Sequence, residues 1–289
     1  MMAAQTGPLP AISFEFFPAK SEKAAATLLE NAKTLAAFGP QFMSVTYGAG
    51  GSTRDRTLAT LKDMVRETGA PMAGHLTCVG ASREEVDAVA RAYWDAGVKH
   101  IVALRGDPPP SAGGVYEPHQ EGYAGAVDLV RGLKEVAPFE ISVAAYPETH
   151  PAALSPQSDL EHLRAKIDAG ADRALTQFFF EADTFLRFRD RAAAVGIEQP
   201  IVPGILPVGS AAQAWKFAEM CGANVPRWMR DLFDGLDETP QTRTLVAATI
   251  ADRLCQTLRA EGVEQFHFYT LNHADTASAL CRLLKHRPL

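Results

Sequence analysis

The chain has 289 residues, 47% of them hydrophobic and 21% charged, which is the composition of a globular protein with a core and excludes a disordered chain. Its 28 basic and 34 acidic residues give a formal net charge of -6 without a Lys/Arg block, so we expect no nucleic-acid partner. Residues 1–10, which we expect to be a flexible N-terminus, lack the features of a signal peptide. No apolar run approaches the about 20 residues of a membrane span, which predicts a cytoplasmic protein with no membrane partner.

Eight β-rich runs follow one another along the chain, and segments of helical periodicity lie between them. The predicted strands are Ala11–Phe17, Phe42–Tyr47, Pro71–Cys78, His100–Gly106, Glu140–Pro147, Arg173–Phe180, Pro200–Val208 and Glu264–Asn272. Segments 21–38, 82–97 and 158–171 open on Ser and carry apolar residues at helical spacing, which is typical of amphipathic helices.

This alternation indicates parallel strands joined by right-handed crossovers, and eight units match an α/β fold of the (β/α)8 TIM-barrel type. An open doubly wound sheet is the alternative, but it commonly has a glycine fingerprint after its first strand, where this chain has FFPAKSEK. Only the connection from about Gly209 to Val263 is long, and it predicts extra helices between strands 7 and 8. We therefore predict a single catalytic domain over residues 1–289.

Chemistry in such a barrel lies at the C-terminal ends of the strands. Nearly every predicted strand ends in hydrogen-bonding or ionisable side chains, namely Glu15, Thr46, Tyr47, His75, Thr77, Arg105, Asp107, Tyr146, Glu148, His150, Thr176, Gln177, Asn272 and His273. We therefore expect an active site at this mouth. Neither His75 nor His150 has companions at ligand spacing, and the four cysteines form no CxxC pair, so we predict no bound metal and reduced thiols.

The first of these side chains, Glu15, lies within the run SFEFFP. It alternates with Phe14 and Phe16, so it faces either the barrel lumen or the helix layer, and both are poorly solvated. Burial raises the pKa of a Glu from about 4.3, and a pKa near 6 to 7 suits a general acid at neutral pH. The alternative is a structural Glu that is hydrogen-bonded or paired with an Arg.

Three further motifs have competing interpretations. The glycines at 48–51 resemble a phosphate cradle, but a strand-to-helix turn needs glycine in any case, so we favour the structural interpretation. Arg105 and Asp107 flank Gly106 before a run of prolines, and they form either a surface ion pair or, as we favour, a rigid contact for a polar ligand. Gln177 either packs in the core or presents its amide to a ligand, and we favour the ligand.

The segments FEFFP, SVTYGAGGSTRDRT, HLTC, HIVALRGDPP, ISVAAYPETHP, ALTQFFF, PGILPV and FHFYTLN together resemble the bacterial-type 5,10-methylenetetrahydrofolate reductases, from about Ile12 to Cys281. The resemblance implies an FAD-containing (β/α)8 barrel with ping-pong turnover. NADH or NADPH passes a hydride to the flavin, leaves, and is replaced by methylenetetrahydrofolate. The product, 5-methyltetrahydrofolate, supplies methyl groups for methionine synthesis, and members of the family commonly form homo-oligomers.

The resemblance also implies roles for individual residues. Glu15 matches the general acid that opens the folate ring to an iminium cation, and Asp107 matches the aspartate that stabilises this charge. The implied substrate-binding residues are Gln177, Gln213, Phe217 and His273. The implied flavin contacts are Thr46, His75, Arg105, Gly106, Tyr123, Ala124, Tyr146, His150, Asp159 and Lys166, of which Arg105 and Lys166 would serve the diphosphate.

Two features depart from the family pattern. His273 stands where the bacterial family often has Arg, and His is shorter and only partly charged at neutral pH. The segment 113–128 is longer than usual, so the flavin contacts are either Tyr123 and Ala124 or residues nearer Asp128. Two other functions stay open: a pterin-binding barrel without flavin, and a barrel lyase that uses Glu15 as its base.

Overall fold

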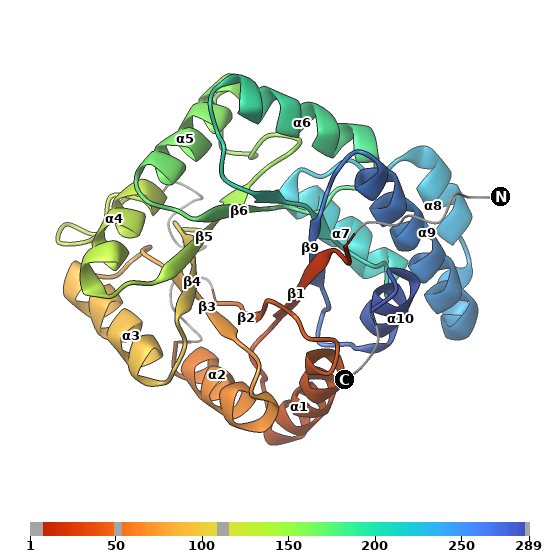
Figure 1. Ribbon diagram of the computed structural model, residues 1–289, viewed down its shortest axis with the longest axis horizontal. Helices are drawn as coiled ribbons and strands as arrows, with labels where there is room; N and C mark the ends of the chain where they lie inside the picture. Colours follow the sequence, from red (N-terminus) through yellow and green to blue (C-terminus); the bar gives the residue numbers. More distant parts are fainter. Residues whose placement is uncertain (1–7, 49–53, 109–115, 287–289) are drawn as a thin grey trace.

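The computed structural model describes residues 8–48, 54–108 and 116–286, and it confirms the predicted barrel. Parallel strands surround a central lumen and helices cover them on the outside (Figure 1). The strands are β1 (Ala11–Phe16), β2 (Phe42–Val45), β3 (Met72–Thr77), β4 (His100–Leu104), β5 (Glu140–Ala145), β6 (Arg173–Thr176), β7 (Ile201–Val202), β8 (Gly204–Ile205) and β9 (Gln265–Tyr269). The helices are α1 (Glu22–Ala36), α2 (Arg54–Thr68), α3 (Arg83–Asp95), α4 (Ala126–Val136), α5 (Pro156–Asp168), α6 (Ala182–Ala194), α7 (Ala211–Cys221), α8 (Arg227–Phe233), the short 3-10 helix η3 (Leu236–Glu238), α9 (Pro240–Ala260) and α10 (Asp275–Leu283).

The seventh predicted strand is divided into two short strands at Pro203. β7 pairs with β6, whereas β8 pairs with β9, and the same stretch of chain thus joins the two ends of the sheet. Proline has no N–H to donate to a sheet, which explains the break. Its carbonyl still accepts the N–H of His267 at 3.0 Å, so the barrel closes at this point.

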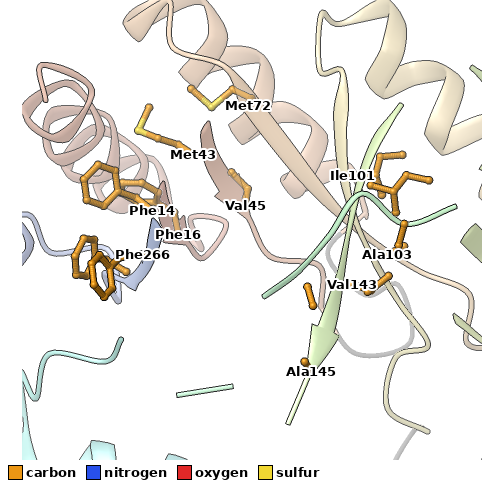
Figure 2. Close-up of a cluster of buried hydrophobic side chains, with 14 of the residues drawn as sticks. Phe14, Phe16, Met43, Val45, Met72, Ile101, Ala103, Val143, Ala145 and Phe266 are labelled. Atoms are coloured by element: carbon orange, nitrogen blue, oxygen red, sulfur yellow. The ribbon is translucent and has the colours of Figure 1, made fainter. Parts of the chain in front are cut away.

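The side chains of β1 alternate between two buried environments. Phe14 and Phe16 are fully buried against the helix layer, together with Phe266 of the neighbouring strand (Figure 2). Burial of each aromatic ring contributes about 1.5 to 3 kcal/mol to folding. Glu15 contacts His75 of β3, which is not adjacent to β1, so it faces the lumen rather than the helices.

Apolar side chains fill the lumen below Glu15. Phe42, Ala73, Val102, Leu175 and Val202 come from five different strands and pack together as a separate cluster. Removing a buried ring such as that of Phe42 costs about 3 to 5 kcal/mol. The lumen is therefore closed below Glu15, and ligands can approach only from the C-terminal mouth.

Serine residues start the helices that the sequence predicts. Ser21 caps α1, and Ser82 caps α3 through a capping box with Glu85. The helix predicted from residue 158 begins earlier, at Pro156, because Ser155 provides the cap and proline suits the first helical position. Within the described ranges, no helix has the length and hydropathy needed to span a bilayer.

Candidate active site

Glu15 lies in the lumen between two buried imidazoles. Its Oε2 is 3.3 Å from Nε2 of His75 and 3.5 Å from Nε2 of His267 on β9. The other ring nitrogen of His267, Nδ1, lies 2.8 Å from Oγ of Ser13. The side chain of Glu15 is 13% exposed and that of His267 only 1%. We call these four residues the Glu15 cluster.

The Glu15 cluster lowers the pKa of Glu15 from its ordinary value of 4.5 to about 2. Burial is the largest single influence and raises this pKa, but the hydrogen bonds and charges of His267 and His75 together outweigh it. The expectation of a raised pKa is therefore wrong in direction, because the neighbouring aromatic rings face away from the carboxylate and two imidazoles face it. Glu15 is therefore ionised near pH 7, with an imidazole on either side of its carboxylate.

A cavity of about 380 Å³ opens beside this cluster, at the ends of β4 and β5, and we call it the β4–β5 cavity. Its lining includes seven of the residues that the sequence singles out, namely Arg105, Gly106, Asp107, Tyr146, His150, Asp159 and Lys166. The last two come from one face of α5 and the others from the ends of two neighbouring strands. The barrel thus brings together side chains from three separate segments.

Lys166 is a buried cation in the wall of the β4–β5 cavity. Its Nζ donates to the carbonyl oxygen of Ala144 at 2.5 Å, and the residue is 8% exposed. Burial lowers the pKa of Lys166 from 10.5 to about 8, although the charge of Asp159 acts in the other direction. Because a carbonyl only partly compensates an ammonium, an anionic group in this cavity would gain a strong interaction.

Two rings form another part of the wall. Tyr146 and His150 meet edge to face, with ring centroids 4.5 Å apart. Burial raises the pKa of Tyr146 to about 12 and lowers that of His150 below its ordinary value. Both rings are therefore neutral near pH 7, and they offer an uncharged aromatic surface beside the cation of Lys166.

Gly106 occupies a position that no other residue could take without strain. Its φ of 85° lies in the left-handed region, and a Cβ there would lie 2.5 Å from Cγ1 of Val79 and 2.9 Å from Cβ of Thr77. The glycine lets the chain turn between Arg105 and Asp107, both of which line the β4–β5 cavity.

A second cavity, of about 350 Å³, lies between the end of β9 and the start of α10, and we call it the β9–α10 cavity. Gln213 and His273, two of the predicted substrate-binding residues, both line it. Tyr269 and Arg243 line it as well, and neither was singled out from the sequence.

Helix α7 begins in the wall of the β9–α10 cavity. Its N-cap Ser210 accepts the N–H of Gln213 at 3.4 Å, and both residues line the β9–α10 cavity. At the C-terminal end of the helix, burial and then the charge of Asp107, which lines the β4–β5 cavity, raise the pKa of Cys221. Phe217 lies between the two ends and is half-buried.

The turn after α7 is joined to the loop after β5. The N–H of Asn224 donates to Oε2 of Glu148 at 3.0 Å. A Cβ on Gly222 would lie 3.1 Å from Cγ of Pro151, so the two loops approach closely. These contacts hold the C-terminal end of α7 over the mouth of the barrel.

Tyr269 lies between the Glu15 cluster and the β9–α10 cavity. Its ring lies edge-on to that of His267 at 5.4 Å, and its hydroxyl donates to the carbonyl oxygen of Thr176 at 2.7 Å. Burial is the main reason that the pKa of Tyr269 is raised well above its ordinary value, and the charges of Glu15 and Tyr146 add to the effect. The Glu15 cluster therefore lies close to the β9–α10 cavity, which Tyr269 lines.

The comparisons with known proteins agree with this geometry. The family model described as methylenetetrahydrofolate reductase matches residues 3–285. The chain belongs to this family. The 5,10-methylenetetrahydrofolate reductase of Escherichia coli (strain K12) is 50% identical over 277 residues, which cover 96% of this chain and 91% of that one. The NADH-type reductase 1 of Arabidopsis thaliana is 35% identical over 91% of this chain and 46% of its own length.

Two solved structures are similar in fold. A Clostridium thermocellum protein that binds two copies of 5-methyl-5,6,7,8-tetrahydrofolic acid has a TM-score of 0.67 at 14% identity, covering 96% of this chain and 94% of that one. A 2,3-dimethylmalate lyase has a TM-score of 0.53 at 10% identity, covering 94% and 77%. At these identities the likeness shows the fold alone. Membership in the methylenetetrahydrofolate reductase family, in contrast, identifies the reduction of methylenetetrahydrofolate as the activity of this chain.

Two residues to which the reductase pattern assigns ligand contacts extend the strand ladders. The N–H of Thr46 donates to the carbonyl of Phe16 at 2.9 Å, and that of Gln177 to the carbonyl of Ala145 at 2.8 Å. The Gln177 Oε1 accepts the N–H of Phe178 at 3.0 Å, which leaves its amide nitrogen for a ligand. Neither residue lines the two cavities described here.

The structure places Tyr123 and Ala124 away from the β4–β5 cavity. Tyr123 is buried and its hydroxyl donates to Oδ1 of Asp87 at 2.7 Å, whereas the N–H of Ala124 donates to Oδ2 of Asp128 at 3.1 Å. Ala126 lines the cavity instead, which favours the alternative of contacts nearer Asp128. The glycine turn falls mostly on residues 49–53, outside the described ranges, so its interpretation stays a prediction.

Sequence reasoning missed four residues of the site. They are His162, Arg243, His267 and Tyr269. A signal existed for three of them: His162 follows Asp159 by three residues on α5, and His267 and Tyr269 alternate in register with Ser13 and Glu15 on the neighbouring strand. Arg243 gave no signal, because it lies in the long connection whose position over the mouth was not predictable.

Proposed function

We propose that this protein reduces 5,10-methylenetetrahydrofolate to 5-methyltetrahydrofolate by ping-pong hydride transfer, with a bound FAD and with NADH or NADPH as the electron donor. The observation that supports this most strongly is the buried Glu15 cluster in the lumen of a barrel whose strand ends also line two cavities. The two cavities offer room for a cofactor and for a substrate.

The residues of the β4–β5 cavity fit an FAD. Lys166 and Arg105 are cations of the kind that bind a diphosphate, and the ammonium of Lys166 has only a carbonyl as its hydrogen-bond acceptor. Tyr146 and His150 add neutral rings, and Gly106 permits close approach of a ligand to the backbone. A flavin bound there would accept a hydride from a nicotinamide and deliver it to a folate.

The substrate must gain one proton and one hydride, and the chain provides the proton. The proton would reach the folate ring through Oε2 of Glu15, which lies 3.3 Å from Nε2 of His75 and 3.5 Å from Nε2 of His267. Protonation opens the five-membered ring and leaves a cationic iminium, and Asp107 stabilises this charge at the cavity wall. The hydride then completes the methyl group.

The proposal is tested by anaerobic titration of the purified protein. We expect a yellow protein whose flavin absorption is bleached by NADH or by NADPH and restored by methylenetetrahydrofolate. The faster of the two nicotinamides identifies the physiological donor. A colourless protein that binds folate without any redox step would contradict the proposal and support a pterin-binding barrel.

A further inference from the structure

The β9–α10 cavity contains a cation with unused hydrogen-bonding capacity. Arg243 lies in the first turn of α9, and its side chain is 16% exposed. Its Nη1 donates to Oδ1 and to the carbonyl oxygen of Asp237, at 3.0 and 3.1 Å. Its Nε is buried and has no partner among the described residues. A guanidinium N–H without an acceptor is costly, so an acceptor that entered the cavity would gain from an interaction with Arg243.

The β9–α10 cavity lies next to the Glu15 cluster. Tyr269 lines it and packs against His267, whose Nε2 is 3.5 Å from Glu15. Gln213 of α7 forms another part of its wall. A substrate whose reacting ring lies beside Glu15 would therefore extend its remaining part into the β9–α10 cavity.

The wall of the cavity is built from strained backbone. Leu271 and Asn272 both have positive φ, of 50° and 64°. Asn272 is fixed by two hydrogen bonds to the backbone of Phe17, at 2.7 and 3.0 Å, and Leu271 lines the cavity. Such conformations cost roughly 1 to 3 kcal/mol each and persist where the surroundings over-determine them. The turn that carries Leu271 is thus fixed by contacts to the FEFFP segment.

Among the charged groups around the cavity, Arg243 is the one that attracts an anionic ligand. Asp275 lines the cavity and repels anions, whereas Asp237 does not line it and also accepts the N–H of Ala211 at 3.1 Å. His273 lines the cavity at the position where the family pattern often has Arg. Arg243 therefore supplies the permanent positive charge that this chain lacks at His273.

We infer that Arg243 binds the carboxylate of the glutamate tail of the folate substrate. This inference rests on the proposed function, because it takes a tetrahydrofolate as the molecule that reacts beside Glu15. Folates carry a p-aminobenzoyl group followed by one or more glutamates, which is an aromatic linker with an anionic end. The guanidinium would donate its unused N–H groups to that end.

The test compares methylenetetrahydrofolate with methylenetetrahydropteroate, which has the same reacting ring but no glutamate. Wild-type protein should have a higher kcat/KM for the compound with the tail. In Arg243→Gln this preference should fall by about 10- to 100-fold, which corresponds to about 1.4 to 2.8 kcal/mol at 1.4 kcal/mol per tenfold. Arg243→Lys should recover part of it, and Asp275→Asn should increase the preference.

Two controls separate tail binding from a structural role. Arg253→Gln removes an exposed arginine from the same helix and should leave the preference unchanged. Asp237→Asn breaks the ion pair but keeps the guanidinium, so it should not weaken the preference. If Asp237→Asn acts like Arg243→Gln, or if Arg243→Gln lowers kcat/KM equally for both compounds, the inference is overturned. If the wild-type protein reduces both compounds equally well, the inference is overturned but the proposed function stands. If it reduces neither compound, both the proposed function and the inference are overturned.

Discussion

The two cavities hold their cations in different ways. In the β4–β5 cavity, Lys166 is buried against a carbonyl and its pKa is lowered to about 8. In the β9–α10 cavity, Arg243 is already paired with Asp237, and the neighbouring Gln213 and His273 are exposed. A buried, weakly compensated charge favours a ligand that stays bound, whereas a compensated charge among exposed side chains suits molecules that exchange. The difference matches a resident cofactor on one side and a changing substrate on the other.

The largest expected effect comes from Glu15, which lies in the barrel lumen. In Glu15→Gln, the rate of folate reduction should fall by about 10²- to 10⁴-fold relative to the rate of flavin reduction, because only the folate step requires a proton. Stopped-flow absorbance of each half-reaction measures this ratio. A parallel loss in both half-reactions would show that Glu15 serves the flavin or the fold instead.

Lys166→Met should affect only the β4–β5 cavity. We expect FAD affinity to fall by about 10- to 100-fold with the loss of one charge-assisted hydrogen bond. The apoprotein should become more stable, by up to about 3 kcal/mol at pH 7, because the cost of the buried charge disappears. Calorimetric titration with FAD and urea unfolding of the apoprotein measure the two effects, and an apoprotein of lower stability would contradict this account.

The lowered pKa of Lys166 also sets the direction of two pH effects. The native state favours the neutral amine, so this group lowers the stability of the apoprotein below pH 8, and the cost is relieved as the pH rises from about 8 to 10.5. FAD affinity should change in the opposite direction and fall through the same range. An FAD affinity without pH dependence between 7 and 10 would show that Lys166 does not contact the diphosphate.

Gly106→Ala tests the backbone of the β4–β5 cavity. The added methyl group meets Val79 and Thr77 at a left-handed position, so the free energy of unfolding should fall by about 1 to 3 kcal/mol and FAD binding should weaken. Gly39→Ala is the matched control, because Gly39 has a similar φ of 64° but open space around it. It should cost about 1 kcal/mol without changing FAD affinity. Equal costs in both variants would mean that only backbone strain matters at Gly106.

The smallest expected effect concerns the β9–α10 cavity. His273→Arg places a second cation at an exposed position and should tighten binding of methylenetetrahydrofolate about 2- to 5-fold, in keeping with about 0.5 to 1 kcal/mol for an exposed ion pair. The Kd for folate, measured with the oxidised protein, checks it. Unchanged or weaker binding would indicate that Arg243 already meets the need for a cation in this cavity.

The sequence predicted the barrel because its signals are local. Strand runs, serine caps and the order of units depend on residues close together in the chain, and the eight units appear where they were expected. The division of the seventh strand at Pro203 could also have been predicted, since proline cannot donate a hydrogen bond within a sheet. The same local reasoning found Arg105, Gly106, Asp107, Tyr146 and His150 in the β4–β5 cavity, because strand ends converge in any parallel barrel, whereas Asp159 and Lys166 of α5 came from the family resemblance.

The amino-acid sequence by itself determined that Glu15 alternates with two phenylalanines and would be removed from water. Only the tertiary structure decided which groups surround it. His75 and His267 reach the carboxylate across a lumen that exists only when β9 closes against β1, and their charges reverse the effect of burial on the Glu15 pKa. The placement of α7 and of Arg243 over the mouth likewise depends on contacts between segments far apart in the chain. Electrostatic interactions act through space, so no pattern along the chain can report their sum.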